Sequence, residues 1–159
     1  MSDSHPVRIR PARFPEDLVE VGRLFRAYAD SLSFDLDFQD FKTELANLPG
    51  AYAKPQGTVL LAECESTVVG CVAVRPLEGG VAEMKRLYVM DAFRGRRLGR
   101  LLAQVSISAA REIGYKQMRL DTVAEMIPAI ALYESLGFET IEAYCHNPLP
   151  SARFFELRL

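Results

Sequence analysis

Four arginines and two glycines are concentrated in a seven-residue run, RGRRLGR, that begins at residue 94. The members of this run are Arg94, Gly95, Arg96, Arg97, Leu98, Gly99 and Arg100. Apolar residues at helical spacing follow, so the run lies where a long helix begins. The first amides of a helix lack an intrahelical acceptor and carry partial positive charge, and glycine lets a ligand approach the backbone. The run therefore predicts a phosphate-binding site, and a solvent-exposed basic helix end is the simpler alternative.

Tyr133 is a second residue that could do chemistry, and it lies in the segment AIALYESLGF. Pro128 before it and Gly137 after it predict a short helix that is followed by a strand. A phenol, with a pKa of about 10, can donate a proton to a leaving thiolate at neutral pH. The alternative interpretation is a tyrosine packed into the core on an amphipathic helix.

Glu83 is a third candidate, in the strand-like segment VAEMKRLYV. Strand alternation places Glu83, Lys85, Leu87 and Val89 on one face unless a bulge intervenes. A carboxylate there could act as a general base, or it could be a surface group paired with a neighbouring cation. The sequence leaves both interpretations open.

The rest of the chain supplies the elements that must position these side chains. Alternating apolar and polar residues predict strands, and apolar residues three or four positions apart predict helices. Asp37 is a predicted N-cap, and Gly114 a predicted helix end. In chain order the predicted elements are strand 7–10, helices 15–29 and 38–48, strands 58–63, 67–75 and 81–89, helix 98–113, strand 116–122, helix 128–136, and strands 138–144 and 152–159.

This order, β-α-α-β-β-β-α-β-α-β-β, predicts an α/β (α+β) fold built on one mixed sheet. A single domain over residues 1–159 is the simplest organisation, because neither an internal repeat nor a long linker interrupts the chain.

The composition excludes several classes of function. Lys and Arg number 19 and Asp and Glu 21, so the net charge is −2, which argues against nucleic-acid binding through bulk charge. No apolar run approaches the roughly 20 residues of a membrane span, so we expect no membrane partner and a cytoplasmic location. Three cysteines without CxxC spacing and two distant histidines predict neither a disulfide framework nor a metal site.

The arginine–glycine run and the segment AIALYESLGF, about thirty residues apart, together resemble the GNAT superfamily of acetyl-CoA-dependent N-acetyltransferases. The resemblance covers nearly the whole chain and implies a mostly antiparallel sheet flanked by helices. It also implies direct transfer of an acetyl group from acetyl-CoA to a primary amine of a small molecule or peptide, within a ternary complex.

The same resemblance implies where the cofactor binds. The CoA pyrophosphate would lie at residues 94–100, and the pantetheine arm between strands 81–89 and 116–122. Backbone groups at Leu87 and Val89, with Tyr88 between them, would contact the pantetheine and acetyl groups.

Two catalytic assignments and two differences also come from the resemblance. Tyr133 would face the CoA sulfur, and Glu83 matches a glutamate that, in some members, deprotonates the acceptor through a water. Arg97 stands where the family usually has glycine, and Met126 stands where it often has an asparagine that contacts the cofactor.

For the acceptor, the resemblance implies walls formed by loop 30–37 and by residues 144–150. Aspartates of the loop could attract a cationic amine, and Lys85 and Arg86 could hold a carboxylate, so an amino-acid-like or small amine acceptor is expected. The alternatives are a non-catalytic CoA-binding module and, with less support, a nucleic-acid-binding protein. A homodimer, paired through the edge of strand 152–159, is also expected.

Overall fold

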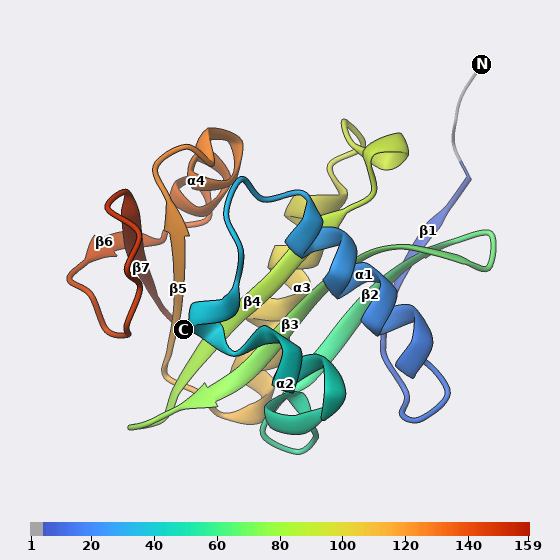
Figure 1. The fold of residues 1–159 in the computed structure, drawn as a ribbon. Coiled ribbons are helices and arrows are strands. Elements are labelled where there is room, and N and C mark those ends of the chain that lie inside the picture. The colour runs from blue at the N-terminus through green and yellow to red at the C-terminus, as the bar shows by residue number, and fades with distance from the viewer. Residues whose placement is uncertain (1–4) are drawn as a thin grey trace.

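The computed structural model describes residues 5–159, and a seven-stranded sheet runs through this part of the chain (Figure 1). The strand order is β1-β2-β3-β4-β5-β7-β6, and every neighbouring pair is antiparallel except β4 and β5. The mixed, mostly antiparallel sheet is therefore confirmed. The strands are β1 (Val7–Pro11), β2 (Thr58–Cys64), β3 (Thr67–Leu77), β4 (Val81–Val89), β5 (Gln117–Val123), β6 (Glu139–Ile141) and β7 (Ala152–Arg158).

Helices cover both faces of the sheet: in Figure 1, α1 and α2 lie in front of it and α3 lies behind it. One apolar cluster joins the α3 face to the sheet through side chains such as Leu102, and a second cluster joins α1 through Phe25. The predicted order of strands and helices is confirmed, with three short 3₁₀ helices added. The helices are α1 (Leu18–Asp30), α2 (Phe41–Ala46), α3 (Leu98–Ile113) and α4 (Ile127–Ser135), and the 3₁₀ helices are η1 (Asp37–Gln39), η2 (Gly50–Tyr52) and η3 (Asp91–Phe93).

The first two helices differ from the prediction. Helix α1 begins at Leu18 rather than at Pro15, because a turn precedes it in which the Asp17 amide donates to the Arg13 carbonyl at 2.7 Å. The predicted helix 38–48 is divided into η1 and α2 by Asp40, whose φ of +55° is left-handed. The predicted N-cap was wrong, since Asp37 lies inside η1 and makes no side-chain cap.

The C-terminal strands also differ. Only Glu139–Ile141 of the predicted strand 138–144 pairs with β7, and the chain then leaves the sheet as a loop. Strand β7 lies between β5 and β6, so both of its sides are paired and it offers no free edge for a partner. The predicted pairing edge was therefore wrong. No helix in the described part of the chain is both long and apolar enough to cross a membrane.

Strand β4 contains a bulge that changes which side chains share a face. Cys71 of β3 pairs with Tyr88 and Ala73 pairs with Lys85, so β4 has one extra residue between the two pairs. Arg86, at a φ of +61°, lies in this bulge. Leu87 and Val89 consequently pack against the α3 cluster, whereas Lys85 reaches Gln39 on the opposite face. The sequence allowed a common face for Glu83, Lys85, Leu87 and Val89 unless a bulge intervened, and this bulge does separate Lys85 from Leu87 and Val89.

Strands β4 and β5 separate after a short parallel segment. Pairing covers only Val81–Glu83 on β4 and Gln117–Arg119 on β5. Beyond Glu83, the backbone of β4 therefore has no strand partner on the β5 side. This separation opens the sheet at the point where the candidate site lies.

Candidate active site

A cleft of about 620 Å³ lies where the end of β4, the loop before α3 and the start of α4 meet. It joins the two sequence motifs, because residues from the arginine–glycine run and from the AIALYESLGF segment both line it. The predicted cofactor residues in its wall are Leu87, Tyr88, Val89, Arg94, Gly95, Arg97, Leu98, Gly99 and Met126. The predicted residues Arg96 and Arg100 lie beside the cleft and do not line it.

The loop before α3 presents its backbone to this cleft. The Leu101 amide donates to the Arg97 carbonyl at 3.1 Å, which is the first hydrogen bond of the helix. The amides of Leu98, Gly99 and Arg100 therefore have no intrahelical acceptor. A Cβ at Gly99 would meet no heavy atom within 4 Å, so open space adjoins this turn. Free amides at a helix start next to open space form an anion-binding site.

Arg97 adopts the conformation that the missing glycine would favour. Its φ of +61° is left-handed, and Gly95 nearby has a φ of +82°. A non-glycine residue pays about 1 kcal/mol or more for this conformation. Arg97 therefore holds a left-handed turn that glycine would adopt without this cost in backbone energy.

The four arginines of the run have different surroundings. Arg94 donates to the Val89 carbonyl at 3.1 Å and pairs with Asp91, and Arg100 donates to Ser135 at 2.7 Å. Arg96 donates to the His5 carbonyl at 3.2 Å and lies over the Phe93 ring. Arg97 is exposed, so its charge remains available at the cleft.

A second, smaller cavity of about 80 Å³ passes between β4 and β5. It shares Tyr28, Leu87, Met126 and Ala129 with the cleft, so the two spaces adjoin. Its remaining lining residues are Gln39, Met84, Lys85, Arg86, Leu120, Asp121, Thr122 and Tyr133. We call this cavity the passage, because it lies in the gap between β4 and β5 and adjoins the cleft.

Tyr133 lies in the wall of the passage. Its ring packs edge-on against Phe138 and beside Phe155, and the residue is 8% exposed. Burial raises the pKa of Tyr133 above its ordinary value, so the phenol keeps its proton at neutral pH. Among residues 5–159, no group forms a hydrogen bond with its hydroxyl, which is therefore free to donate to a ligand.

Glu83 is 1% exposed and does not line the cleft or the passage. Its carboxylate accepts hydrogen bonds from Arg75 Nε at 2.7 Å and from the Tyr144 hydroxyl at 2.6 Å. Burial acts to raise the pKa of Glu83, but the charges of Lys85 and Arg75 and these hydrogen bonds outweigh it and leave the pKa below its ordinary value. Such a carboxylate accepts protons weakly, so its predicted role as base stays a prediction.

The polar side chains of the passage include Lys85 and Arg86, for which the sequence predicted contact with an acceptor carboxylate, and Gln39 and Asp121, which had no predicted role. Lys85 is 7% exposed and donates to Gln39 Oε1 at 3.0 Å, and Arg86 donates to the same oxygen at 2.8 Å. Asp121 projects from β5 and accepts a hydrogen bond from Asn147 at 3.0 Å. Alternation along residues 116–122 could have placed Asp121 opposite the buried Met118 and Leu120, but no local pattern in the chain points to Gln39.

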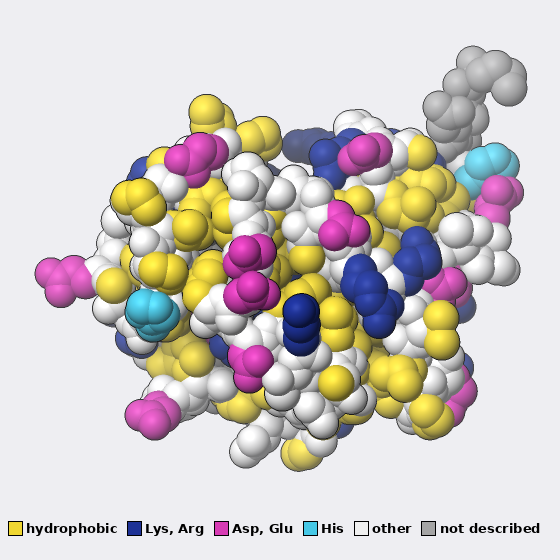
Figure 2. Space-filling model, in the orientation of Figure 1, with side chains coloured by type: hydrophobic (Ala, Val, Ile, Leu, Met, Phe, Trp, Pro, Cys, Tyr) yellow, Lys and Arg dark blue, Asp and Glu magenta, His cyan; other side chains and the backbone are white. Residues whose placement is uncertain are grey.

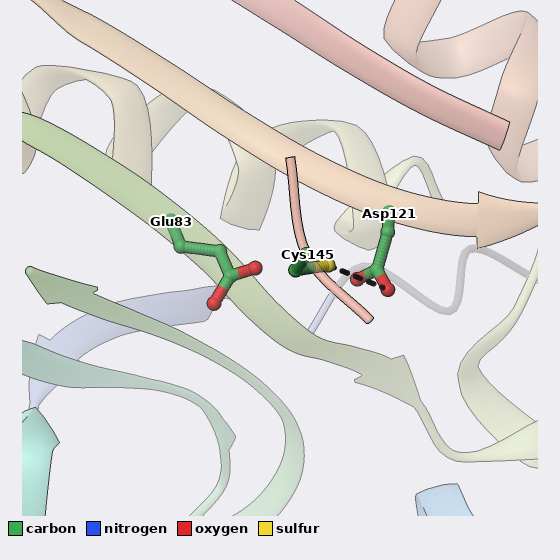
Figure 3. Close-up of side chains that lie close together, drawn as sticks. All are labelled: Glu83, Asp121 and Cys145. Carbon is green, nitrogen blue, oxygen red and sulfur yellow. Dashed lines mark hydrogen bonds between the residues drawn. The ribbon is translucent and has the colours of Figure 1, made fainter. Parts of the chain in front are cut away.

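Glu83, Asp121 and Cys145 lie close together, with one ligand atom of each within 4.8 Å of the others (Figure 3). The thiol of Cys145 lies 3.7 Å from Asp121 Oδ2, as the dashed line shows. Burial and the neighbouring Asp121 raise the pKa of Cys145 to about 12, so it is not an activated nucleophile at neutral pH. Since Glu83 is also paired with Arg75, we assign no metal to this cluster.

The predicted acceptor loop lies on the face that carries α1. Asp30, Asp35 and Asp37 are all exposed, and acidic side chains lie along this loop in Figure 2. Basic side chains cover α1 beside it, where Arg23 and Arg26 are exposed. The loop aspartates thus lie on the outer surface, whereas Asp121 is the carboxylate that lines the passage.

Comparison with known proteins points to one family. A model of the acetyltransferase (GNAT) family matches residues 21–138. An uncharacterized N-acetyltransferase of Schizosaccharomyces pombe is 41% identical over 155 residues, which are 96% of this chain and 95% of the relative. Mouse N-acetylaspartate synthetase is 33% identical over 84% of this chain and 46% of its own length. A Salmonella typhimurium acetyltransferase solved with its cofactor acetyl-CoA has a TM-score of 0.69 and 22% identity, over 96% of this chain and 93% of its own.

Proposed function

Because the chain belongs to the acetyltransferase (GNAT) family, we propose that it transfers an acetyl group from acetyl-CoA to a primary amine of a small molecule or peptide. The observation that supports this most is the passage between β4 and β5, which adjoins the cleft and is lined by the Tyr133 phenol. Two reactants that enter from opposite faces of the sheet can meet there, as direct transfer in a ternary complex requires.

The residues of the cleft fit the chemistry of CoA. The free amides of Leu98, Gly99 and Arg100 would hold the pyrophosphate, with Arg97 adding charge. The backbone of β4 around Leu87 and Val89, which has no strand partner on the β5 side, would pair with the pantetheine amides. Acetyl-CoA, when bound, supplies an activated thioester carbonyl.

The side chains of the passage would handle the proton transfers. The Tyr133 hydroxyl would donate a proton to the sulfur as the carbon–sulfur bond breaks and the new carbon–nitrogen bond forms. Asp121 faces the passage and would bind the amino group of the acceptor close to the reacting carbonyl, and the ammonium would release its proton to solvent water before the neutral nitrogen attacks. The mouse relative is named for making an acetylated amino acid, which is consistent with a small amine as acceptor.

The proposal is tested by incubating the protein with acetyl-labelled acetyl-CoA and a mixed library of amino acids, polyamines, aminoglycosides and peptides. We expect label in an amide product, with CoA released in equal amount. Acetyl-CoA binding by calorimetry, without transfer to any member of the library, would instead favour the non-catalytic CoA-binding module. Binding of DNA that CoA does not displace would favour a nucleic-acid-binding protein.

A further inference from the structure

Several charges lie around the passage, and most of them are paired within the protein. Arg75 pairs with Glu83 at 2.7 Å. Arg86, only 1% exposed at its side chain, forms two hydrogen bonds to Glu44, at 2.8 and 2.9 Å. A buried charge is stable when an opposite charge and hydrogen bonds compensate it, so these two pairs need no ligand.

Lys85 and Asp121 are the charged residues of the passage that remain. Among the residues that the structure describes, no carboxylate lies within 4.0 Å of Lys85 Nζ and no cation within 4.0 Å of Asp121. The hydrogen-bond partners of the two side chains are neutral, namely Gln39 for Lys85, and Asn147 and the Cys145 thiol for Asp121.

The two residues face the same small space from neighbouring strands. Lys85 comes from β4 and Asp121 from β5, and both line the passage together with Tyr133. Burial lowers the pKa of Lys85, whereas the nearby charges of Glu83 and Asp121 act to raise it. A ligand with an anionic group next to Lys85 would add to that stabilisation of the ammonium form.

From this arrangement we infer that the acceptor is zwitterionic, an amino acid whose carboxylate binds Lys85 and whose ammonium group binds Asp121. This inference rests on the proposed acetyl transfer and specifies its substrate class. A cation and an anion on two walls of one passage match the two charges of a free amino acid.

The first experiment compares acceptors that differ only in the carboxylate. Leucine, leucinamide and 3-methylbutylamine share one side chain, and phenylalanine with 2-phenylethylamine makes a second matched set. We expect kcat/KM to be at least about ten-fold higher for the amino acid than for its amine, as a hydrogen bond to a charged group implies. Glutamate, lysine and glycine extend the panel to other side chains, at concentrations on the order of ten times a usual KM of about 1 mM.

The second experiment separates the two charged residues. Lys85→Met should bring the kcat/KM for an amino acid close to the kcat/KM for its matched amine, so that their ratio is close to one, because only the carboxylate loses its partner. Asp121→Asn should raise KM for amino acids and amines alike, because both carry the ammonium group. Lys42→Met, which changes an exposed lysine on α2, is the matched control and should leave the ratio unchanged.

Acetyl-CoA affinity, measured by calorimetry for every variant, distinguishes failure of the zwitterion inference from failure of the proposed acetyl transfer. If acetyl-CoA binds and simple amines are acetylated as well as or better than every amino acid, the zwitterion inference is wrong and the acetyl transfer stands. If no acceptor of either kind is acetylated, both are wrong. An unchanged ratio in folded Lys85→Met also overturns the inference.

Discussion

The cleft and the passage adjoin each other, but the cleft wall is built largely from backbone and the passage from side chains. The cleft wall at the start of α3 is contiguous in sequence, and it offers backbone amides beside Gly99. The passage is lined by side chains from α1, η1, β4, β5 and α4, and its polarity depends on which charges are already paired. A site made of consecutive backbone amides can be recognised from a sequence motif. A site made of the side-chain charges that remain unpaired in the fold cannot.

The largest effect is expected where the two regions meet. Tyr133→Phe removes only the hydroxyl and keeps the ring contacts with Phe138 and Phe155. We expect kcat to fall by about 10² to 10⁴-fold, as the loss of a proton donor implies, with little change in the KM for acetyl-CoA. Steady-state kinetics measures both constants.

Tyr115→Phe is the matched control. The Tyr115 hydroxyl donates to the Gln56 carbonyl at 2.6 Å and lines neither the cleft nor the passage. This variant should keep the kcat of the unmodified protein. An unchanged kcat in folded Tyr133→Phe would remove the phenol from the mechanism.

The next effect concerns the charge pairs that support the passage. Glu44→Gln leaves the buried Arg86 guanidinium without its compensating charge. The free energy of unfolding should fall by about 3 kcal/mol, since breaking one side of a buried pair is strongly destabilising. Urea denaturation measures this change.

Glu20→Gln provides the comparison at an exposed pair. The Glu20 and Arg23 side chains are 43% and 42% exposed, and they lie 2.6 Å apart on α1. Loss of this ion pair in Glu20→Gln should change the free energy of unfolding by less than about 1 kcal/mol. Equal losses in the two variants would show that burial does not set the strength of the Arg86 pair.

A smaller effect is expected in the cleft, where backbone access matters most. Gly99→Val places a branched side chain next to the free amides, and we expect acetyl-CoA to bind more than about ten-fold more weakly, or about 1.4 kcal/mol. Gly99→Ala should cost less, because a Cβ alone meets no heavy atom within 4 Å. Calorimetry on the folded variants measures both affinities. A normal affinity for acetyl-CoA in Gly99→Val would mean that the phosphate site lies elsewhere.

The smallest effect is expected from a single surface charge of the same loop. Arg97→Ala should weaken acetyl-CoA binding by less than Gly99→Val does, and the loss should shrink with added salt because exposed charges are screened. Arg111→Ala, an exposed arginine in the last turn of α3, controls for the general loss of charge. A loss for Arg97→Ala that equals that of Gly99→Val would mean that side chains, rather than amides, hold the phosphates.

Much of the fold could be predicted because its signals are local. The bounds of β4 and α3 match the prediction, and Gly114 ends α3 at a φ of +112°. The start of α1 differs from the prediction because a contact with another element decides it. Asp17 is held at 2.8 Å by Arg10 of β1, which fixes a turn where the pattern predicts a helix.

The sequence by itself determined the arginine–glycine turn at the start of α3, because helix-start amides and glycines follow one another along the chain. Only the tertiary structure decided which side chains line the passage. The bulge at Arg86, whose side chain is held by Glu44 and Gln39 from 42 and 47 positions earlier, shifts β4 by one residue. Because side chains alternate along a strand, that single residue separates Lys85 from Leu87 and leaves Lys85 facing Asp121 across the passage.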